Sequence, residues 1–408
     1  MTSPRIRFSA FTGPWQTVEL SDVCTINPPT GNLPYEFIYI DLESVKEGRL
    51  SSTNKINSSS APSRAQRLVE PKDILFQTVR PYQQNNLFFE GINNENVVAS
   101  TGYAQIRATK ADPYFLYCAI QTKQFLKNVL DRCAGGTFPS INTSELKSIL
   151  IRNTTTTEQK QIGAFFYLLE EKINLATRKI ELLEKIRKTT TDQIFKRSLG
   201  LKKPDESLYE TWQECSFTDI FAFLRTKPIP RAHLNGHNSP YNIHYGDILT
   251  KYDITIDLQT DELPSISDDI NMSNIDVLKE GDLIIADTAE DSSAGKAIEI
   301  LNTCNHTIYA GLHTFACRPN TKFAPGFLGY YLNSSTYHNQ LLRLMTGTKV
   351  LSISKAQIST TKILIPTLAE QERIITLLNN LREKTRVQRK KLCALKALKN
   401  ALLQQMFV

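Results

Sequence analysis

The sequence predicts an α+β protein that is built twice: two mixed α/β domains alternate with two long helices in one chain of 408 residues. Two observations lead to this expectation. Residues 157–195 and 369–407 align without a gap at a shift of 212, and both have the 3–4 apolar spacing of coiled-coil helices. The stretches before them contain short apolar runs bounded by Gly and Pro, which is typical of strands.

The repeat extends beyond the helices. Matched positions lie along the whole chain: Trp15 with Trp212, Asp73 with Asp282, Arg107 with Arg318, Gly135 with Gly347, and Ser140 with Ser352. The shift grows from 197 to 212, so the second copy carries about fifteen extra residues early in its globular part. We expect domains at 1–156 and 199–368, helices at 157–198 and 369–408, and a pseudo-two-fold organisation.

The helices carry more apolar surface than a simple pair needs. The first seam begins at Ile162 and keeps alternating steps of four and three residues to Ile194. Further apolar residues lie off this seam, so the apolar band is wide enough for a partner helix as well as an intramolecular hairpin. The residues expected to form these contacts are Phe165, Leu169, Ile173, Ile180 and Leu183 in the first helix, and Leu381, Leu392, Leu395 and Leu398 in the second.

Composition indicates an anionic partner but not a simple basic domain. The net charge is +7. Counting Lys and Arg minus Asp and Glu, the helices hold (9 − 6) + (9 − 3) = +9 and the globules (16 − 13) + (14 − 19) = −2. Contact of the globules with nucleic acid must therefore come from local loops, with much of the phosphate contact left to a partner. No apolar run reaches membrane-spanning length, no signal sequence is evident, and seven scattered cysteines suggest a reducing cytoplasm.

Within each globule the same order of elements is expected. Strands are predicted at 37–40, 73–79, 282–286 and 362–366, and shorter helical stretches at 113–131 and 325–345. A Gly-containing loop follows each helical stretch, at 134–142 and 346–354, and a final strand follows each loop.

Two strand-following loops have side chains suited to nucleic acid. The loop after 73–79 carries Arg80, Tyr82, Gln83, Gln84, Asn85 and Asn86. Arg can bind guanine in a bidentate manner, and Gln or Asn can pair with adenine. The matching loop in the second copy is acidic and carries Thr288, Ser292, Ser293 and Lys296, while the Gly loops add Thr137 and Lys349 as phosphate-contacting candidates. The alternative for each loop is an ordinary polar surface turn.

The sequence holds no convincing catalytic pattern. Asn27-Pro28-Pro29-Thr30 has Thr where amino-methyltransferases have an aromatic residue, and no Gly-rich cofactor loop precedes it. The sequence around Lys296 lacks the Gly and the Ser or Thr of a P-loop. The six histidines, including His233 and His237, do not have metal-ligand spacing. No catalytic residue, cofactor or metal is expected.

Two divergent globules alternating with two similar helices, which open on Glu158-Gln159 and Glu370-Gln371, resemble the specificity subunit of type I restriction–modification systems. The resemblance implies two target recognition domains that read a split DNA site and two helices packed antiparallel. It also implies docking of two adenine-methyltransferase subunits, which use S-adenosylmethionine, and of restriction subunits in some complexes. The subunit itself is non-catalytic. One departure from the family is the net charge of −5 in the second domain, which opposes direct contact with DNA phosphates.

Three alternatives remain. The chain could be a subunit of a related solitary or phage-exclusion methyltransferase, an enzyme in its own right, or a coiled-coil scaffold that does not read DNA.

Overall fold

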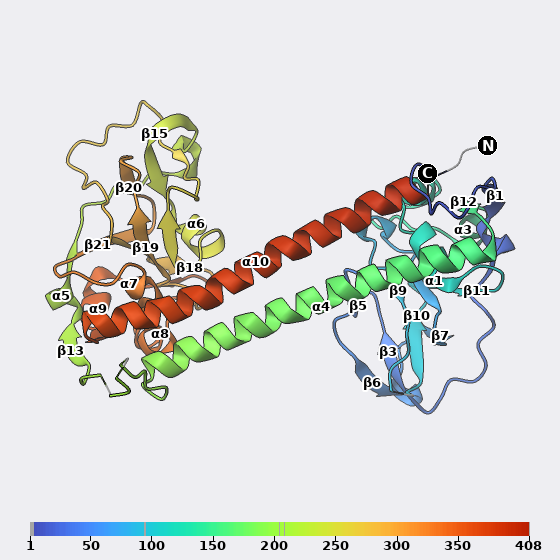
Figure 1. The fold of residues 1–408 in the computed structure, drawn as a ribbon, viewed down its shortest axis with the longest axis horizontal. Helices are drawn as coiled ribbons and strands as arrows, with labels where there is room; N and C mark the ends of the chain where they lie inside the picture. The colour runs from blue at the N-terminus through green and yellow to red at the C-terminus, as the bar shows by residue number, and fades with distance from the viewer. Residues whose placement is uncertain (1–3, 94, 204, 208, 408) are drawn as a thin grey trace. The chain divides into compact units, whose positions relative to one another are not determined.

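The computed structural model describes residues 4–93, 95–203, 205–207 and 209–407. The chain divides into two compact units, Met1–Lys179 with Gln388–Val408, and Ile180–Val387. Two long helices, α4 (Thr156–Phe195) and α10 (Leu368–Met406), each contribute one part to each unit (Figure 1). Both long helices are thus present, but α4 ends at 195 and α10 at 406, whereas the sequence predicted 157–198 and 369–408. Across the described residues, no helix is long and apolar enough to cross a membrane.

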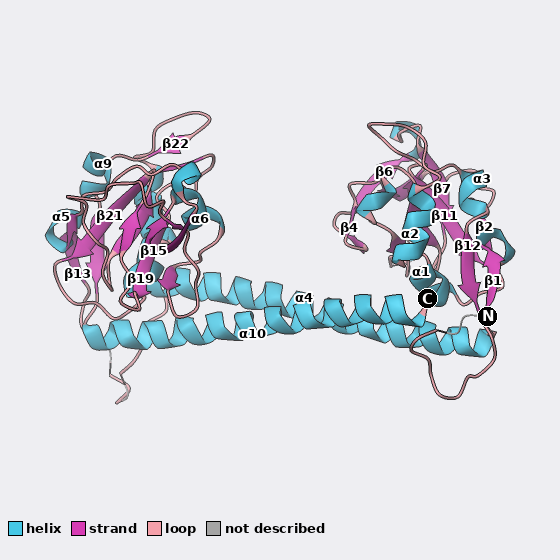
Figure 2. Cartoon of the chain, turned by 90° about the horizontal axis from the view of Figure 1, so that it is seen from above, coloured by secondary structure: helices cyan, strands magenta, loops and turns pink. Residues whose placement is uncertain are grey.

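The described residues of the first unit form two four-stranded sheets and three short α-helices. Figure 2 shows these strands and helices by colour. One sheet is antiparallel, in the order β2 (Cys24–Ile26), β11 (Tyr103–Ala108), β8 (Ile74–Gln77), β9 (Leu87–Phe88). The other has the order β6 (Asn54–Asn57), β3 (Glu36–Ile40), β10 (Val97–Ser100), β7 (Ala65–Val69), with β3 and β10 parallel. The remaining elements are β1 (Gln16–Glu19) paired with β12 (Leu150–Asn153), the ribbon β4 (Val45–Lys46) and β5 (Arg49–Leu50), and the helices α1 (Pro113–Ala119), α2 (Lys123–Leu130) and α3 (Thr143–Lys147).

In the part of the second unit that the structure describes, the strands form one five-stranded sheet and three two-stranded ribbons. The sheet order is β14 (Phe221–Phe223), β21 (Thr314–Pro319), β17 (Leu283–Ala286), β19 (Ala297–Asn302), β16 (Thr255–Asp257). The ribbons are β13 (Gln213–Ser216) with β23 (Lys362–Ile365), β15 (Gly236–Ile243) with β20 (Ile308–Ala310), and β18 (Thr288–Ala289) with β22 (Leu351–Ser352). The short helices are α5 (Phe217–Ile220), α6 (Tyr245–Thr250), α7 (Phe327–Leu332), α8 (Ser335–Leu342) and α9 (Lys355–Ser359).

The two units repeat one framework. The three-strand set β2–β11–β8 corresponds to β14–β21–β17, and the ribbon β1–β12 to β13–β23. The predicted α+β class, the internal repeat and the four predicted strands are confirmed. Two expectations need correction. Each predicted short helical stretch is a pair of helices, because Thr122 and Ser334 cap a second helix with their hydroxyls. A short capped helix, α3 or α9, also separates each Gly loop from its final strand.

Each unit closes its core around two helix ends. In the first unit, Ile162, Phe166 and Leu169 near the start of α4 join a buried cluster with Leu403, Met406 and Phe407 at the end of α10. In the second, Ile194 and Phe195 at the end of α4 join Ile374, Ile375 and Leu378 at the start of α10. The start of one helix meets the end of the other in both units, so the helices run antiparallel, as the resemblance implied.

The Glu-Gln pair that opens each long helix is a structural anchor. Gln159 accepts a hydrogen bond from the backbone N–H of Asp112 at 2.8 Å, and Gln371 accepts one from Ala324 at 2.9 Å. Both glutamines also donate to backbone carbonyls just before their helix, those of Thr154 and Pro366. Each glutamine thereby fixes the start of its helix to the loop before α1 or α7.

A buried ion pair is also duplicated. Arg107 binds Asp73 through two donors at 2.8 Å, and Arg318 binds Asp282 at 2.9 and 2.7 Å. Both aspartates are almost fully buried and also accept a backbone N–H, from Glu70 and Lys279 respectively. The pair links the loop before the central strand to the neighbouring strand in each unit, which explains why these residue types occur at matched positions.

We predict that Asp73→Asn and Asp282→Asn each destabilise their own unit. Each change leaves a guanidinium without its buried counter-ion. We expect a loss of about 2–4 kcal/mol in the free energy of unfolding, less than for a fully buried pair because the arginines remain partly exposed. Urea unfolding measures it. Arg132→Ala, which breaks an exposed 3.6 Å contact with Glu145, is the control and should change little. Equal losses in all three variants would contradict the prediction.

Candidate nucleic-acid interface

In the first unit the two predicted loops lie against each other. Val79, just after β8, forms an isolated antiparallel bridge with Ser140 of the Gly loop. The backbone N–H of Arg80 donates to the carbonyl of Pro139 at 2.7 Å. Arg80 and Gln84 both have left-handed backbone conformations, and they enclose the 3-10 turn Pro81–Gln83. The strand-following loop and the Gly loop therefore form one continuous surface.

The Arg80 side chain is held on that surface by an aromatic ring. Its guanidinium carbon lies 4.3 Å from the centroid of the Phe138 ring, which is itself 57% exposed. A cation over an aromatic face keeps its hydrogen-bond donors free at its edge. Arg80 is thus positioned in advance for an external acceptor. Phe138 was not among the predicted residues, although its place in the Gly loop directly before Pro139 could have suggested it.

Three of the predicted residues line a single groove. Arg80, Gln83 and Asn85 belong to the wall of a groove of about 790 Å³. Two further cations, Lys46 and Arg64, come from other segments that line it. Sequence reasoning missed these because β4 and the turn before β7 lie far from the loop in the chain. The groove collects guanidinium, ammonium and amide groups, the side chains that proteins use on base edges and phosphates, together with one carboxylate, that of Glu43.

A buried glutamine shapes the loop from inside. Gln77, at the end of β8, donates to Oε1 of Gln83 at 2.7 Å and accepts from the backbone N–H of Asn85 at 3.1 Å. Its own backbone N–H donates to Oδ1 of Asn86 at 2.8 Å. Asn86 is buried, so its side chain holds the loop and does not face the groove. Tyr82 and Gln84 are exposed on the loop, and Thr137 on the Gly loop.

The second unit repeats the loop pair with different side chains. Thr288 pairs with Ser352 in the β18–β22 ribbon, at the positions that match Val79 and Ser140. Thr288 is buried and donates to the carbonyl of Leu351, and the Lys296 ammonium donates to the carbonyl of Tyr252 at 2.7 Å. Burial lowers the pKa of Lys296. The side chains of Thr288 and Lys296 thus bind carbonyl groups of their own unit. Ser292 and Lys349 are exposed, and Ser293 is half-buried.

Asn27, the first residue of the Asn-Pro-Pro-Thr motif, has structural partners. Asn27 donates to the Thr143 hydroxyl at 3.0 Å and accepts from the Gln105 backbone at the same distance, so it joins β2, α3 and β11. Within the described part of the chain, no group of three or more His, Cys, Asp or Glu side chains could hold a metal ion. The side chain of His237 lies outside the described residues.

A second surface runs along α4. Leu169, Ile173 and Ile180 are buried, and they form the seam of the helix pair. Leu183, Leu381, Leu392 and Leu395 are half-buried, whereas Phe165 and Leu398 are exposed. Exposed apolar residues form a second stripe: Phe165, Leu168 (61% exposed), Leu175 (68%), Leu182 and Ile186. Their steps of 3, 7, 7 and 4 residues continue the coiled-coil spacing, one position before the buried seam.

The stripe is incomplete on α10. Phe165, Leu175 and Ile186 correspond to Leu377, Val387 and Leu398 at the shift of 212, and the last two are exposed. Two other off-seam residues, Ile375 and Leu403, are buried in the cores of their own units. Some apolar residues outside the seam therefore pack into the cores of the globules, and the others form the exposed stripe. In the first unit, Phe165, Leu168 and Leu175 also line a shallow hollow of about 470 Å³.

The fold and the two loop pairs define a duplicated α+β protein, and no group of side chains in its described residues could hold a metal ion. Residues 13–185 and 209–397 match the family described as "Type I restriction modification DNA specificity domain". These two matches cover most of the sequence, and the chain belongs to this family.

Individual relatives agree with this assignment. The chain is 25% identical over 154 residues to the type I restriction enzyme HindI specificity subunit of Haemophilus influenzae; this covers 36% of the chain and only 33% of that relative. A structure determined for the assembly and conformational transition of a type I R-M system has a TM-score of 0.57 at 23% identity, covering 97% of this chain and 99% of the other. The type I S subunit from M. genitalium has a TM-score of 0.57 at 14% identity, covering 100% and 99%. The structural likenesses show a shared fold.

Proposed function

We propose that this chain is the non-catalytic specificity subunit of a type I restriction–modification complex, in which each globule reads one half of a split DNA site. The observation that carries the proposal is the groove of the first unit, where Arg80, Gln83 and Asn85 converge. Each of these side chains can form two hydrogen bonds to a base edge in the major groove. The duplicated framework supports a bipartite site, because each copy presents its own loop pair.

Two methyltransferase subunits, and restriction subunits where a complex includes them, would supply the catalysis. The uncovered stripe on α4 supports docking of a helix from such a partner, since its 3–4 spacing is that of a coiled-coil seam. Partial repetition of the stripe on α10 supports two docking positions in each chain. The globules together carry a net charge of only −2, so the partner subunits would supply much of the phosphate contact of the assembled complex.

The direct test is to map adenine methylation in cells that express this chain with its methyltransferase partner. We expect methylation at a motif of two short specific parts with an unspecific gap. Methylation at a single continuous motif, or methylation that is unchanged when this chain is removed, would contradict the proposal.

Arg80→Ala should weaken recognition of one half-site. Loss of a bidentate guanine contact costs about 1–3 kcal/mol, roughly a 5- to 150-fold loss in affinity of the complex for its site. Competition binding against DNA changed in each half-site measures this. Lys55→Ala, which removes a surface lysine paired with Glu36 outside the groove, is the control. The prediction fails if both variants weaken specific and unspecific DNA equally.

The second unit offers a matched pair of lysines. Lys349 is exposed on the Gly loop, whereas Lys296 donates to carbonyls of its own unit. Lys349→Ala should lower affinity for all DNA sequences and reduce the salt dependence of binding by about one ion, as expected for a phosphate contact. Lys296→Met should reduce thermal stability but leave the salt dependence unchanged. The opposite result would show that Lys296 faces DNA.

Leu175→Asp should abolish methyltransferase docking without unfolding the chain. The side chain is 68% exposed, so the charge is solvated in the free subunit but would be buried in a helix–helix contact. Co-purification with the partner measures docking, and circular dichroism measures folding. Leu150→Asp, at a 52% exposed leucine of β12, is the matched control. Normal docking of the Leu175 variant would rule out this face.

A further inference from the structure

Each long helix opens on a buried glutamate, but the two carboxylates have different partners. In the first unit, Arg7 donates to Glu158 twice, at 2.6 and 2.8 Å, in a bidentate ion pair. The Trp15 indole donates at 3.3 Å, and the Thr154 hydroxyl also contacts the carboxylate. These hydrogen bonds outweigh burial and lower the pKa of Glu158. The site is a buried carboxylate whose charge is fully matched.

The corresponding carboxylate in the second unit lacks most of these donors. The Trp212 side chain donates to Glu370, as Trp15 does to Glu158. Pro366 stands at the position of Thr154 and has no hydroxyl. Glu370 is 94% buried, and no described group donates to its Oε2. Burial raises the pKa of Glu370. A buried polar atom without a partner is costly and uncommon in folded proteins.

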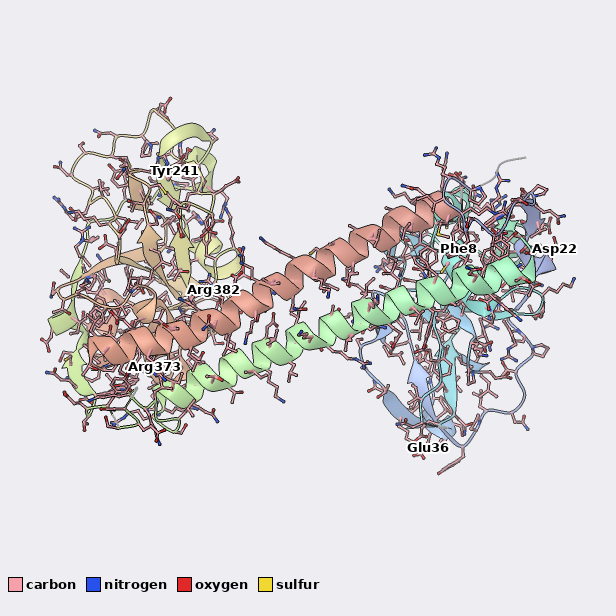
Figure 3. All side chains as sticks on the ribbon, in the orientation of Figure 1. Phe8, Asp22, Glu36, Tyr241, Arg373 and Arg382 are labelled. Carbon is pink, nitrogen blue, oxygen red and sulfur yellow. The ribbon has the colours of Figure 1, made fainter. Side chains whose placement is uncertain are left out.

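Backbone hydrogen bonds show which residue of the second unit stands at the position of Arg7. In the first unit the N–H groups of Arg5 and Ile6 donate to the Gln405 carbonyl at 2.9 and 3.1 Å. In the second unit Ser198 and Leu199 donate in the same way to Gln193, which matches Gln405 at the shift of 212. The next residue is Arg7 in the first case and Gly200 in the second. The following residues, Phe8 and Leu201, both pack against the core of their unit; Phe8 is labelled in Figure 3. Gly200 therefore occupies the place of the arginine.

A pocket remains beside Gly200. It has a volume of about 180 Å³, and its lining includes Gly200, Trp212 and Glu370. A Cβ atom added to Gly200 would have no heavy atom within 4 Å. The volume exceeds that of several water molecules, so a planar guanidinium fits. Arg197 also lines the pocket and partly offsets the effect of burial on the Glu370 pKa, but no ion pair joins them among the described contacts.

We propose that the Glu370 pocket is a binding site for a guanidinium group, which an arginine of another polypeptide inserts as Arg7 does beside Glu158 within this chain. The planar group would donate two parallel hydrogen bonds to the carboxylate, including the unpartnered Oε2. The pocket would therefore recognise an arginine-bearing partner at the junction of the second globule and the helices. This inference does not depend on DNA recognition.

The indole N–H signals in a ¹⁵N NMR spectrum provide the test, because the chain has two tryptophans, one beside each glutamate. The probe is N-acetyl-arginine amide, and its uncharged citrulline counterpart is the control. We expect the arginine probe to shift the Trp212 signal saturably and leave the Trp15 signal unchanged, with at least a tenfold weaker response to citrulline. A Trp212 signal that neither probe moves, or that both move equally, would overturn the proposal.

Two substitutions sharpen the result. Glu370→Gln should remove the response to the arginine probe. Gly200→Arg should fill the pocket from within, raise the melting temperature by roughly 2–4 °C, and block the probe. Gly200→Met is the control for volume without charge, and an equal rise with Met would overturn the ionic assignment. A concentration-dependent Trp212 shift without probe would identify a second copy of this chain as the source of the arginine; a concentration-independent spectrum with a probe response identifies a different polypeptide.

Discussion

The structure depends on one constraint: neither globule has a complete core without both long helices. The core of the first unit contains Phe166 from α4 and Phe407 from the end of α10, with ring centroids 6.2 Å apart, and Phe407 also packs against Trp15 and Phe115. Residues separated by almost the whole chain must therefore meet before this core is closed. Such non-local closure slows folding, because the entropy of a long loop is lost before the contact is gained. The first unit can be completed only when the last helix has been made.

Both units need the apolar contacts between the helices and the globule, so these contacts are repeated, whereas the charged residues at matched helix positions differ. In the first unit the seam carries Lys399 and Glu170, paired at 2.6 Å. The matched positions in the second unit are Arg187 and Arg382, two like charges. Asp253 binds both, at 3.0 and 3.4 Å, and Arg382 also donates to Thr255; Arg382 is labelled in Figure 3. Because Asp253 belongs to the globule, the pairing that is internal to the helices in one unit attaches the globule to the helices in the other.

The sequence predicts the features that depend on local patterns, but not the sites that form where distant segments of the chain meet. The heptad spacing located both long helices, because it rests on side-chain periodicity. The repeat matched Asp73 with Asp282 and Arg107 with Arg318, but only the structure shows that they form ion pairs. The groove was found only in part. Arg80 and Gln83 lie on one loop, whereas Lys46 and Arg64 reach the groove through tertiary packing that no local pattern records. The sequence also could not show that Asn86 is buried and stabilises the loop while neighbouring polar residues are exposed, because all of them have similar side chains.

The loop pair itself shows how a fixed framework can carry changing specificity. The bridge between Val79 and Ser140 recurs as the pairing of Thr288 with Ser352, so the backbone geometry is maintained by main-chain contacts. The side chains presented beside it differ completely. Arg80 and Phe138 in one copy stand where the other has Ala289 and Val350, replacing a stacked cation with a small apolar pair. Main-chain hydrogen bonds tolerate any side chain, so the surface can change its chemistry without disturbing the anchors at Gln159 and Gln371. Two loop surfaces with unlike chemistry on one repeated framework would suit the proposed DNA site if its two halves differ in sequence.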